Sequence, residues 1–116
     1  MIVDALEEKL LKGLRPKFVY LIPAFQNPTG KTMTIQRRAS LARLAAEFDF
    51  YIVADEVYQF LYFKDAPPPP MMYFDHQSKM ISVGSFSKIL APGLRVGWIH
   101  ASVSYTHLTL PTILLV

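Results

Sequence analysis

The chain has 116 residues, of which 52% are hydrophobic, and its formal net charge is +3. That length allows one small domain, and because the chain has no cysteine, disulfides and thiolate metal sites are excluded. The basic residues form no stripe that would favour nucleic-acid binding, and no apolar run is long enough to span a bilayer. The amino terminus shows no signal-peptide pattern, so we expect a cytoplasmic protein, and the high hydrophobic fraction favours a piece of a larger one.

Two segments have the apolar spacing of amphipathic helices. Residues 3–12 are predicted to form the first, with Ala5, Leu6 and Leu10 on one face. The second is expected to begin after Thr34, because threonine is a favourable N-cap residue, and its apolar residues recur at helical spacing.

Short runs rich in β-branched and aromatic residues predict four strands, at residues 17–22, 51–54, 80–83 and 96–99. Residues 51–54 (YIVA) are apolar without a break, which is typical of a strand covered on both faces. Four consecutive prolines at residues 67–70 indicate a loop. Strands that alternate with helices predict an α/β fold with a largely parallel sheet.

Polar residues follow three of the predicted strands. Asn27, Asp55 and Lys88 each come just after a strand, and ligands of such sheets gather at the carboxyl ends of the strands. The three side chains are therefore expected at one edge of the sheet.

Lys88 follows an apolar run, and apolar surroundings favour the neutral amine, which can attack a carbonyl. Ser85, Ser87 and Arg95 supply hydroxyl groups and a cation that suit a phosphate. A nucleophilic amine beside a phosphate site is what pyridoxal 5′-phosphate requires. Taken alone, the stretch fits an ordinary surface lysine equally well.

Other patterns are less specific. Residues 27–30 (NPTG) could be a simple turn, and a P-loop is rejected because Phe25 stands where that motif needs glycine. Asp55 could pair with a protonated ring nitrogen, and Tyr58 could donate to a ring oxygen. Ser85-x-x-Lys88 matches a serine β-lactamase motif, but the accompanying Ser-Asp-Asn and Lys-Thr-Gly tripeptides do not occur. The three histidines show no ligand spacing, so no metal site is predicted.

Four motifs occur together in the order, and close to the spacing, of one enzyme family. They are Asn27-Pro28-Thr29-Gly30, Asp55-Glu56-Val57-Tyr58, Ser85-Phe86-Ser87-Lys88 and Arg95-Val96-Gly97-Trp98. With them the chain resembles the class I/II aminotransferases, which are pyridoxal-phosphate enzymes of fold type I, and it looks most like the branch of 2-aminoadipate and kynurenine aminotransferases. The resemblance covers residues 1–102 and implies the middle of a large domain, with a mixed, mostly parallel sheet flanked by helices.

The resemblance also implies a role for each matching residue. Lys88 would form the internal aldimine and move a proton during transamination, which makes it catalytic together with Asp55 and Tyr58. Asp55 would bind the pyridinium nitrogen, and Tyr58 and Asn27 would bind the ring 3′-oxygen. The phosphate would be held by Ser85, Ser87 and Arg95. The Asn27–Pro28 peptide is often cis in the family.

The resemblance further implies that amino acids and 2-oxo acids are the substrates and that the parent is a homodimer. The scattered basic residues and the lack of a long apolar run predict no nucleic-acid or membrane partner. Several hundred residues of such an enzyme are missing here, so we expect the isolated chain to be inactive. Residues 103–116 do not match the family and are hypothesised to be an artefact. Two alternatives remain open: the effector domain of a MocR-type transcription regulator, and another fold type I enzyme such as a decarboxylase or synthase.

Overall fold

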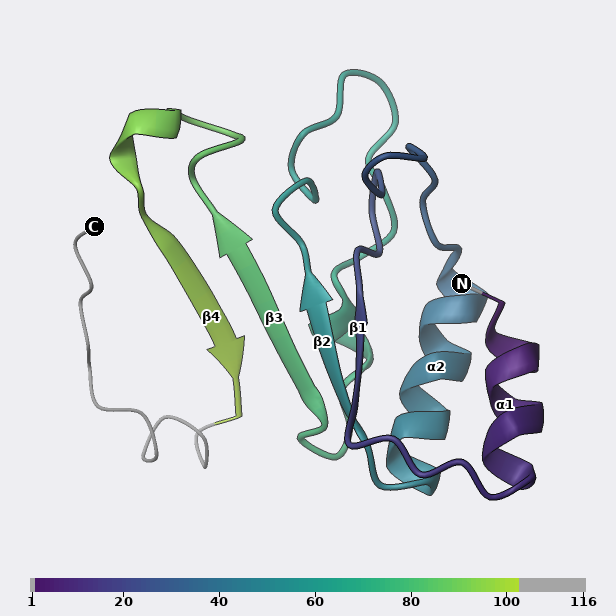
Figure 1. The fold of residues 1–116 in the computed structure, drawn as a ribbon. Coiled ribbons are helices and arrows are strands. Elements are labelled where there is room, and N and C mark those ends of the chain that lie inside the picture. Colours follow the sequence, from purple (N-terminus) through teal and green to yellow (C-terminus); the bar gives the residue numbers. More distant parts are fainter. Residues whose placement is uncertain (1, 103–116) are drawn as a thin grey trace.

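The computed structural model describes residues 2–102. Its elements, in chain order, are α1 (Val3–Leu11), β1 (Phe18–Leu21), α2 (Ile35–Glu47), β2 (Tyr51–Asp55), the 3-10 helix η1 (Met71–Phe74), β3 (Met80–Ser85), the 3-10 helix η2 (Pro92–Leu94) and β4 (Gly97–Ala101) (Figure 1). Every predicted helix and strand is confirmed, whereas the two 3-10 helices were not predicted. The prediction for residues 103–116 lies outside the described residues.

The strands form one sheet in the order β1-β2-β3-β4. The first three run parallel, and β4 pairs with β3 in the antiparallel direction. The expected mixed, mostly parallel sheet is therefore confirmed. Leu21 lies beside Ala54, and Asp55 lies beside Val83, so the first three strands end at the same edge.

One face of the sheet carries the core. Alternate residues of a strand point to opposite faces, so the buried side chains Leu21, Ile52, Ala54 and Met80 share one side of the sheet. They belong to the same hydrophobic cluster as the buried residues of α2. On the opposite face Phe18 and Tyr20 are exposed, and Val53 is only half-buried. The prediction that residues 51–54 are covered on both faces is therefore wrong for the described part of the chain, because helices cover a single face there.

The two helices pack on each other, and α2 also contacts β2 and η1 (Figure 1). Thr34 caps α2 as predicted, since its hydroxyl accepts a hydrogen bond from the Arg37 amide at 3.4 Å. In α1 the buried side chains are Val3 and Leu10, whereas Ala5 is exposed. The buried face of this helix therefore includes Leu10, as predicted, but Val3 in place of Ala5. Neither of these helices has the length and apolar character needed to cross a membrane.

Candidate functional site

The site residues predicted from the sequence lie in the loops that follow β1, β2 and β3. These loops occupy residues 22–34, 56–70 and 86–96, and they lie together at the upper edge of the sheet in Figure 1. Because parallel strands end at one edge, the loops bring Asn27, Tyr58 and Lys88 to the same side of the molecule. The expected gathering of polar residues at one edge is confirmed.

Asp55 is the last residue of β2 and is half-buried. Its Oδ2 accepts a hydrogen bond of 2.6 Å from the hydroxyl of Tyr20, and its Oδ1 accepts one of 3.4 Å from the Val57 amide. The pKa of the Tyr20 hydroxyl is raised to about 12. The hydrogen bond to Asp55 is the largest cause, and partial burial and the charge of Asp55 add smaller contributions. Asp55 is thus held in place while its carboxylate keeps free lone pairs for a further donor.

Tyr20 was not identified from the sequence as a site residue. Tyr20 pairs with Val53 in the sheet, so these two side chains point to the same face. Asp55 follows Val53 by two positions in β2 and therefore points to that face as well. The alternation of residues within β1 and β2 predicts that the two side chains share a face, but only once the register between the strands is known.

Asn27 and Tyr58 both keep hydrogen-bonding capacity. Asn27 is exposed, and its side-chain amide forms no hydrogen bond within residues 2–102. The Asn27–Pro28 peptide bond is cis, as the resemblance implied. Tyr58 is half-buried in the turn after β2, and its phenol is near enough to contribute to the raised pKa of Tyr20. Both groups are therefore available to a ligand at this edge.

The hairpin between β3 and β4 carries the other predicted residues. The Ser85 hydroxyl accepts from the Ser87 amide at 3.1 Å and donates to the Val96 carbonyl at 3.4 Å. Arg95 adopts a left-handed conformation with φ of 51° and is exposed. The hairpin therefore presents hydroxyl groups, a guanidinium and the Lys88 amine on one connection.

The environment of Lys88 differs from the expectation. Its side chain is exposed, and it forms no hydrogen bond or ion pair within residues 2–102. Apolar surroundings were predicted for this amine because an apolar run precedes it. The structure shows that this run is β3 itself, in which alternate residues are buried and Met80 belongs to the hydrophobic core, whereas Lys88 lies beyond the end of the strand.

Taken together, these groups fit the cofactor expected from the sequence. A carboxylate with free lone pairs suits a protonated ring nitrogen, and an exposed primary amine suits an aldehyde. Hydroxyl groups and a guanidinium suit a phosphate.

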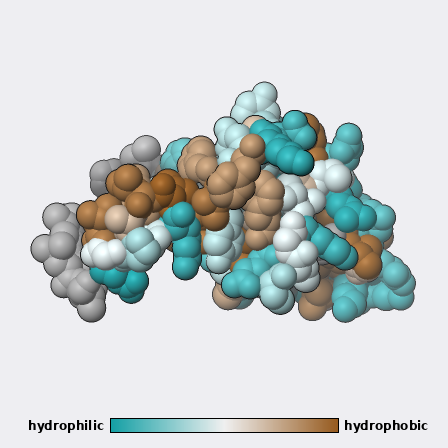
Figure 2. All heavy atoms as spheres, turned by 90° about the horizontal axis from the view of Figure 1, so that it is seen from above, coloured by the Kyte–Doolittle hydropathy of each residue, from teal (hydrophilic) through white to brown (hydrophobic). Residues whose placement is uncertain are grey.

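Apolar side chains surround the same edge. In Figure 2, which looks onto the molecule from above, hydrophobic side chains gather over the half that contains β3 and β4. The exposed large hydrophobic residues of the loops 56–70 and 86–96 are Phe60, Leu61, Tyr62, Phe63, Phe86, Leu90, Leu94 and Val96. An apolar rim around polar groups is typical of a ligand site.

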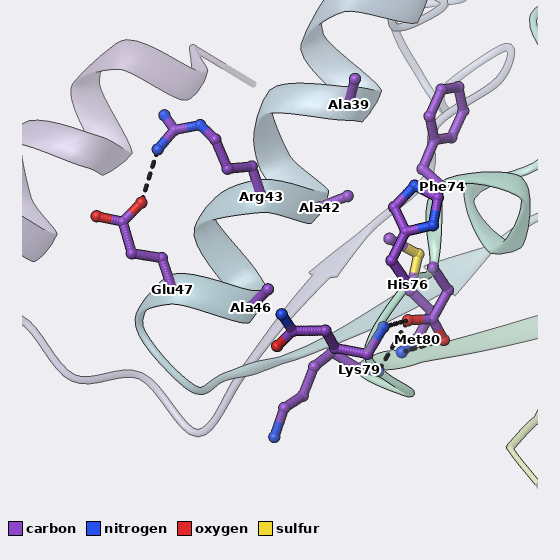
Figure 3. Close-up of a pocket in the computed structure, with 11 residues that line it drawn as sticks. Ala39, Ala42, Arg43, Ala46, Glu47, Phe74, His76, Lys79 and Met80 are labelled. Carbon is purple, nitrogen blue, oxygen red and sulfur yellow. Dashed lines mark hydrogen bonds and ion pairs between the residues drawn. The ribbon is translucent and has the colours of Figure 1, made fainter.

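A separate groove of about 400 Å³ lies between α2 and residues 74–80 (Figure 3). Ala39, Ala42 and Ala46 of α2 point toward it, and Lys79 and Met80 border it at the start of β3. This is the amino end of the strand, whereas Lys88 follows its carboxyl end. The groove therefore contains none of the predicted site residues.

Comparison with known proteins gives consistent matches. The family model described as aminotransferase class I and II matches residues 1–109. Aromatic-amino-acid aminotransferase 1 of Thermococcus litoralis is 49% identical over 105 residues, which cover 87% of this chain and 25% of that protein. An uncharacterized HTH-type transcriptional regulator of Bacillus subtilis, YisV, is 40% identical over 83 residues, covering 72% of this chain and 17% of the regulator.

Among solved structures, the chain is similar to the kynurenine aminotransferase of Pyrococcus horikoshii, determined in complex with PMP, with KYN as substrate and KYA as product. The TM-score is 0.86 at 41% identity, and the match covers 92% of this chain and 28% of that one. The chain thus spans about a quarter of the length of the aminotransferases it matches.

Proposed function

Since the chain belongs to the class I and II aminotransferases, we propose that it forms part of a pyridoxal 5′-phosphate enzyme that transfers an amino group from an amino acid to a 2-oxo acid. The observation that carries the proposal is the gathering of Asn27, Asp55 and Lys88 at the ends of three adjacent parallel strands. Further support comes from the kynurenine aminotransferase of similar fold that was determined with PMP.

When bound, pyridoxal 5′-phosphate supplies an aldehyde and a conjugated ring that withdraws electrons from the Cα of the substrate. Lys88 offers the primary amine, and its Nζ would move the proton from Cα. The carboxylate of Asp55 would accept the ring N–H and hold that proton in place, which keeps the ring electron-withdrawing. Tyr20 would orient this carboxylate through its 2.6 Å hydrogen bond.

The remaining residues would bind and orient. Tyr58 and Asn27 would donate hydrogen bonds to the 3′-oxygen of the ring, which their free side chains allow. Ser85, Ser87 and Arg95 would hold the phosphate, because hydroxyl and guanidinium groups match its oxygens. The Ser85 hydroxyl would turn its hydrogen from the Val96 carbonyl to a phosphate oxygen. The hydrogen bond from the Ser87 amide to the Ser85 hydroxyl restricts the backbone conformation of this part of the hairpin before any anion binds.

We further propose that the complete enzyme is a cytoplasmic homodimer that acts in amino-acid metabolism. The resemblance of the motifs to the family supports this proposal. The unfilled apolar rim at the site supports a larger protein, because it leaves room for segments that would enclose the substrates.

The test is an absorbance spectrum of the chain mixed with pyridoxal 5′-phosphate, before and after borohydride reduction. A visible band that reduction traps onto the protein is expected, with the label on the peptide that contains Lys88. The Lys88→Ala variant should lose the label, whereas Lys79→Ala, which removes an ion-paired lysine at the other end of β3, should keep it. Equal labelling of both variants would contradict the proposed role of Lys88.

A second candidate is a PLP-binding effector domain of a transcription regulator, which the match to the HTH-type regulator YisV favours. The two functions differ in what the longer protein carries and does. A DNA-binding domain ahead of this segment, with cofactor binding but no turnover of amino acids, would support the regulator. Amino-group transfer to a 2-oxo acid would support the enzyme.

A further inference from the structure

Arg38 is a fully buried cation that none of the roles above uses. It lies on α2 with a relative exposure of 0%, and Glu56, with 5%, is the nearest carboxylate at 3.9 Å. Burial lowers the pKa of the Arg38 guanidinium, while the charge of Glu56 opposes that shift. Because isolated charges are costly to bury, a pair in this position is retained only where its hydrogen bonds are well satisfied.

The Arg38 guanidinium closes the loop that carries Asn27. Its Nη2 donates to the Pro23 carbonyl at 3.0 Å, and its Nε donates to the Met33 carbonyl at 3.1 Å. The Met33 amide also donates to the Pro23 carbonyl, at 2.8 Å. One side chain therefore ties together both ends of the loop after β1.

The same side chain reaches the loop that follows Asp55. Its Nη1 donates to the Pro69 carbonyl at 2.9 Å. Glu56, the residue after Asp55, accepts from the Met71 amide at 2.7 Å and from the Ser82 hydroxyl at 2.5 Å. The carboxylate thus joins the end of β2 to β3 and to the end of the proline-rich loop.

We propose that Arg38 and Glu56 are positioning residues, which hold the Asn27 loop and the Asp55 loop in one fixed geometry beneath the cofactor site. The proposal rests on the proposed function for the identity of the ligand, but not for the coupling between the loops. Arg38 is suited to this role because the Nε, Nη1 and Nη2 of its planar fork donate to three carbonyls from three nitrogens of one rigid plane, whereas the donors of a lysine all lie on a single nitrogen at the end of a flexible stem. A buried, fully bonded network of this kind restricts both loops before ligand binds.

The first test needs no cofactor. Amide hydrogen exchange is measured in the protein with Arg38→Met and, as matched control, Arg43→Met, which removes an arginine of the same helix that forms two exposed ion pairs. Arg38→Met should speed exchange at least tenfold at the amides of Gly30 and Met71, which are bonded to Gln26 and Glu56 and not to Arg38 itself. The Phe86 amide, in the β3–β4 hairpin, should be unchanged.

In Arg38→Met, which removes the whole cation, acceleration in only one loop would overturn the proposal because it denies coupling between the loops. Equal acceleration at Phe86 would also overturn it, because it denotes general destabilisation. If Arg38→Met does not fold, Arg38→Lys serves instead. It keeps a cation beside Glu56, so Met71 should stay protected, while the lost fork should still speed exchange at Gly30. Unchanged exchange at Gly30 in Arg38→Lys would refute the role of the fork.

The second test separates this inference from the proposed function. Pyridoxal 5′-phosphate should bind Arg38→Met at least tenfold more weakly than Arg43→Met, while borohydride labelling of Lys88 at saturating cofactor is retained. If the unaltered protein is never labelled at Lys88, the proposed function fails and the exchange experiment still decides the coupling. If both arginine variants bind the cofactor alike, the positioning role fails and the proposed function survives.

Discussion

Gly84 lies where β3 passes directly beneath the indole of Trp98. The two residues are partners in the β3–β4 pairing, and both lie on the same face of the sheet. A Cβ added to Gly84 would lie 2.2 Å from Cε2 and Cζ2 of Trp98 and 2.7 Å from its Nε1. Ordinary contacts begin near 3.4 Å, so in Gly84→Ala the indole would have to move by roughly 1 Å.

The cost follows from where the indole can go. Trp98 also packs on Phe86, with ring centroids 4.9 Å apart, so a displaced indole loses or strains that contact. Overpacking of this kind costs about 1–3 kcal/mol. We expect Gly84→Ala to lower the free energy of unfolding by that amount, measured by urea denaturation with far-UV circular dichroism. Trp98 is the only tryptophan, so its fluorescence should change in the folded variant.

Gly93→Ala is the matched control, because an added Cβ there meets nothing within 4 Å. Its free energy of unfolding should stay within about 0.5 kcal/mol of the unaltered chain. In a Trp98→Ala background the clash is absent, so Gly84→Ala should then cost little. A full cost of Gly84→Ala without the indole would refute the steric reasoning and leave the backbone of β3 as the cause.

Three further predictions concern single side chains. Tyr20→Phe removes a hydroxyl whose pKa is raised from 10.0 to about 12 in the folded chain. A group whose pKa is higher in the folded than in the unfolded state stabilises the fold while it is protonated, and this stabilisation is lost as the pH rises from 10 to 12. In urea titrations over that pH range, the free energy of unfolding should therefore fall more steeply for the unaltered chain than for the variant. Thr34→Ala removes the N-cap of α2 and should lower the free energy of unfolding by about 1 kcal/mol, with a matching loss for Thr34→Val and almost none for Thr34→Ser. Leu44→Ala leaves a cavity where a fully buried side chain is removed and should lower the free energy of unfolding by about 2–5 kcal/mol. Leu11→Ala, at an exposed position of α1, should lower it by well under about 1 kcal/mol in the same denaturation assay.

Much of the fold could be predicted because its signals are local. The helical spacing in α2 and the Thr34 cap act over a few residues, and both predictions are confirmed. The face of α1 was mistaken at Ala5 because several faces of a short helix carry apolar residues, and only packing against α2 selects one. The cover over β2 was mistaken because an apolar run indicates burial without indicating which segment provides it.

The candidate site divides in the same way. The positions of Asn27, Asp55 and Lys88 after strands followed from the sequence, since each lies next to a recognisable apolar run. The exposure of Lys88 did not follow, because it depends on what else packs against the hairpin.

By itself the sequence determined the order of helices and strands, the motifs at the strand ends and the family that they resemble, because these depend on residues close together in the chain. Only the tertiary structure decided that Tyr20 is the partner of Asp55 and that Arg38 is buried beside Glu56. These contacts join residues 35 and 18 positions apart. The alternation of side chains along a strand does not specify its register with the neighbouring strand, so the sequence does not indicate the contact between Tyr20 and Asp55. Arginines on helices are mostly exposed to solvent, so the sequence does not indicate that Arg38 is buried.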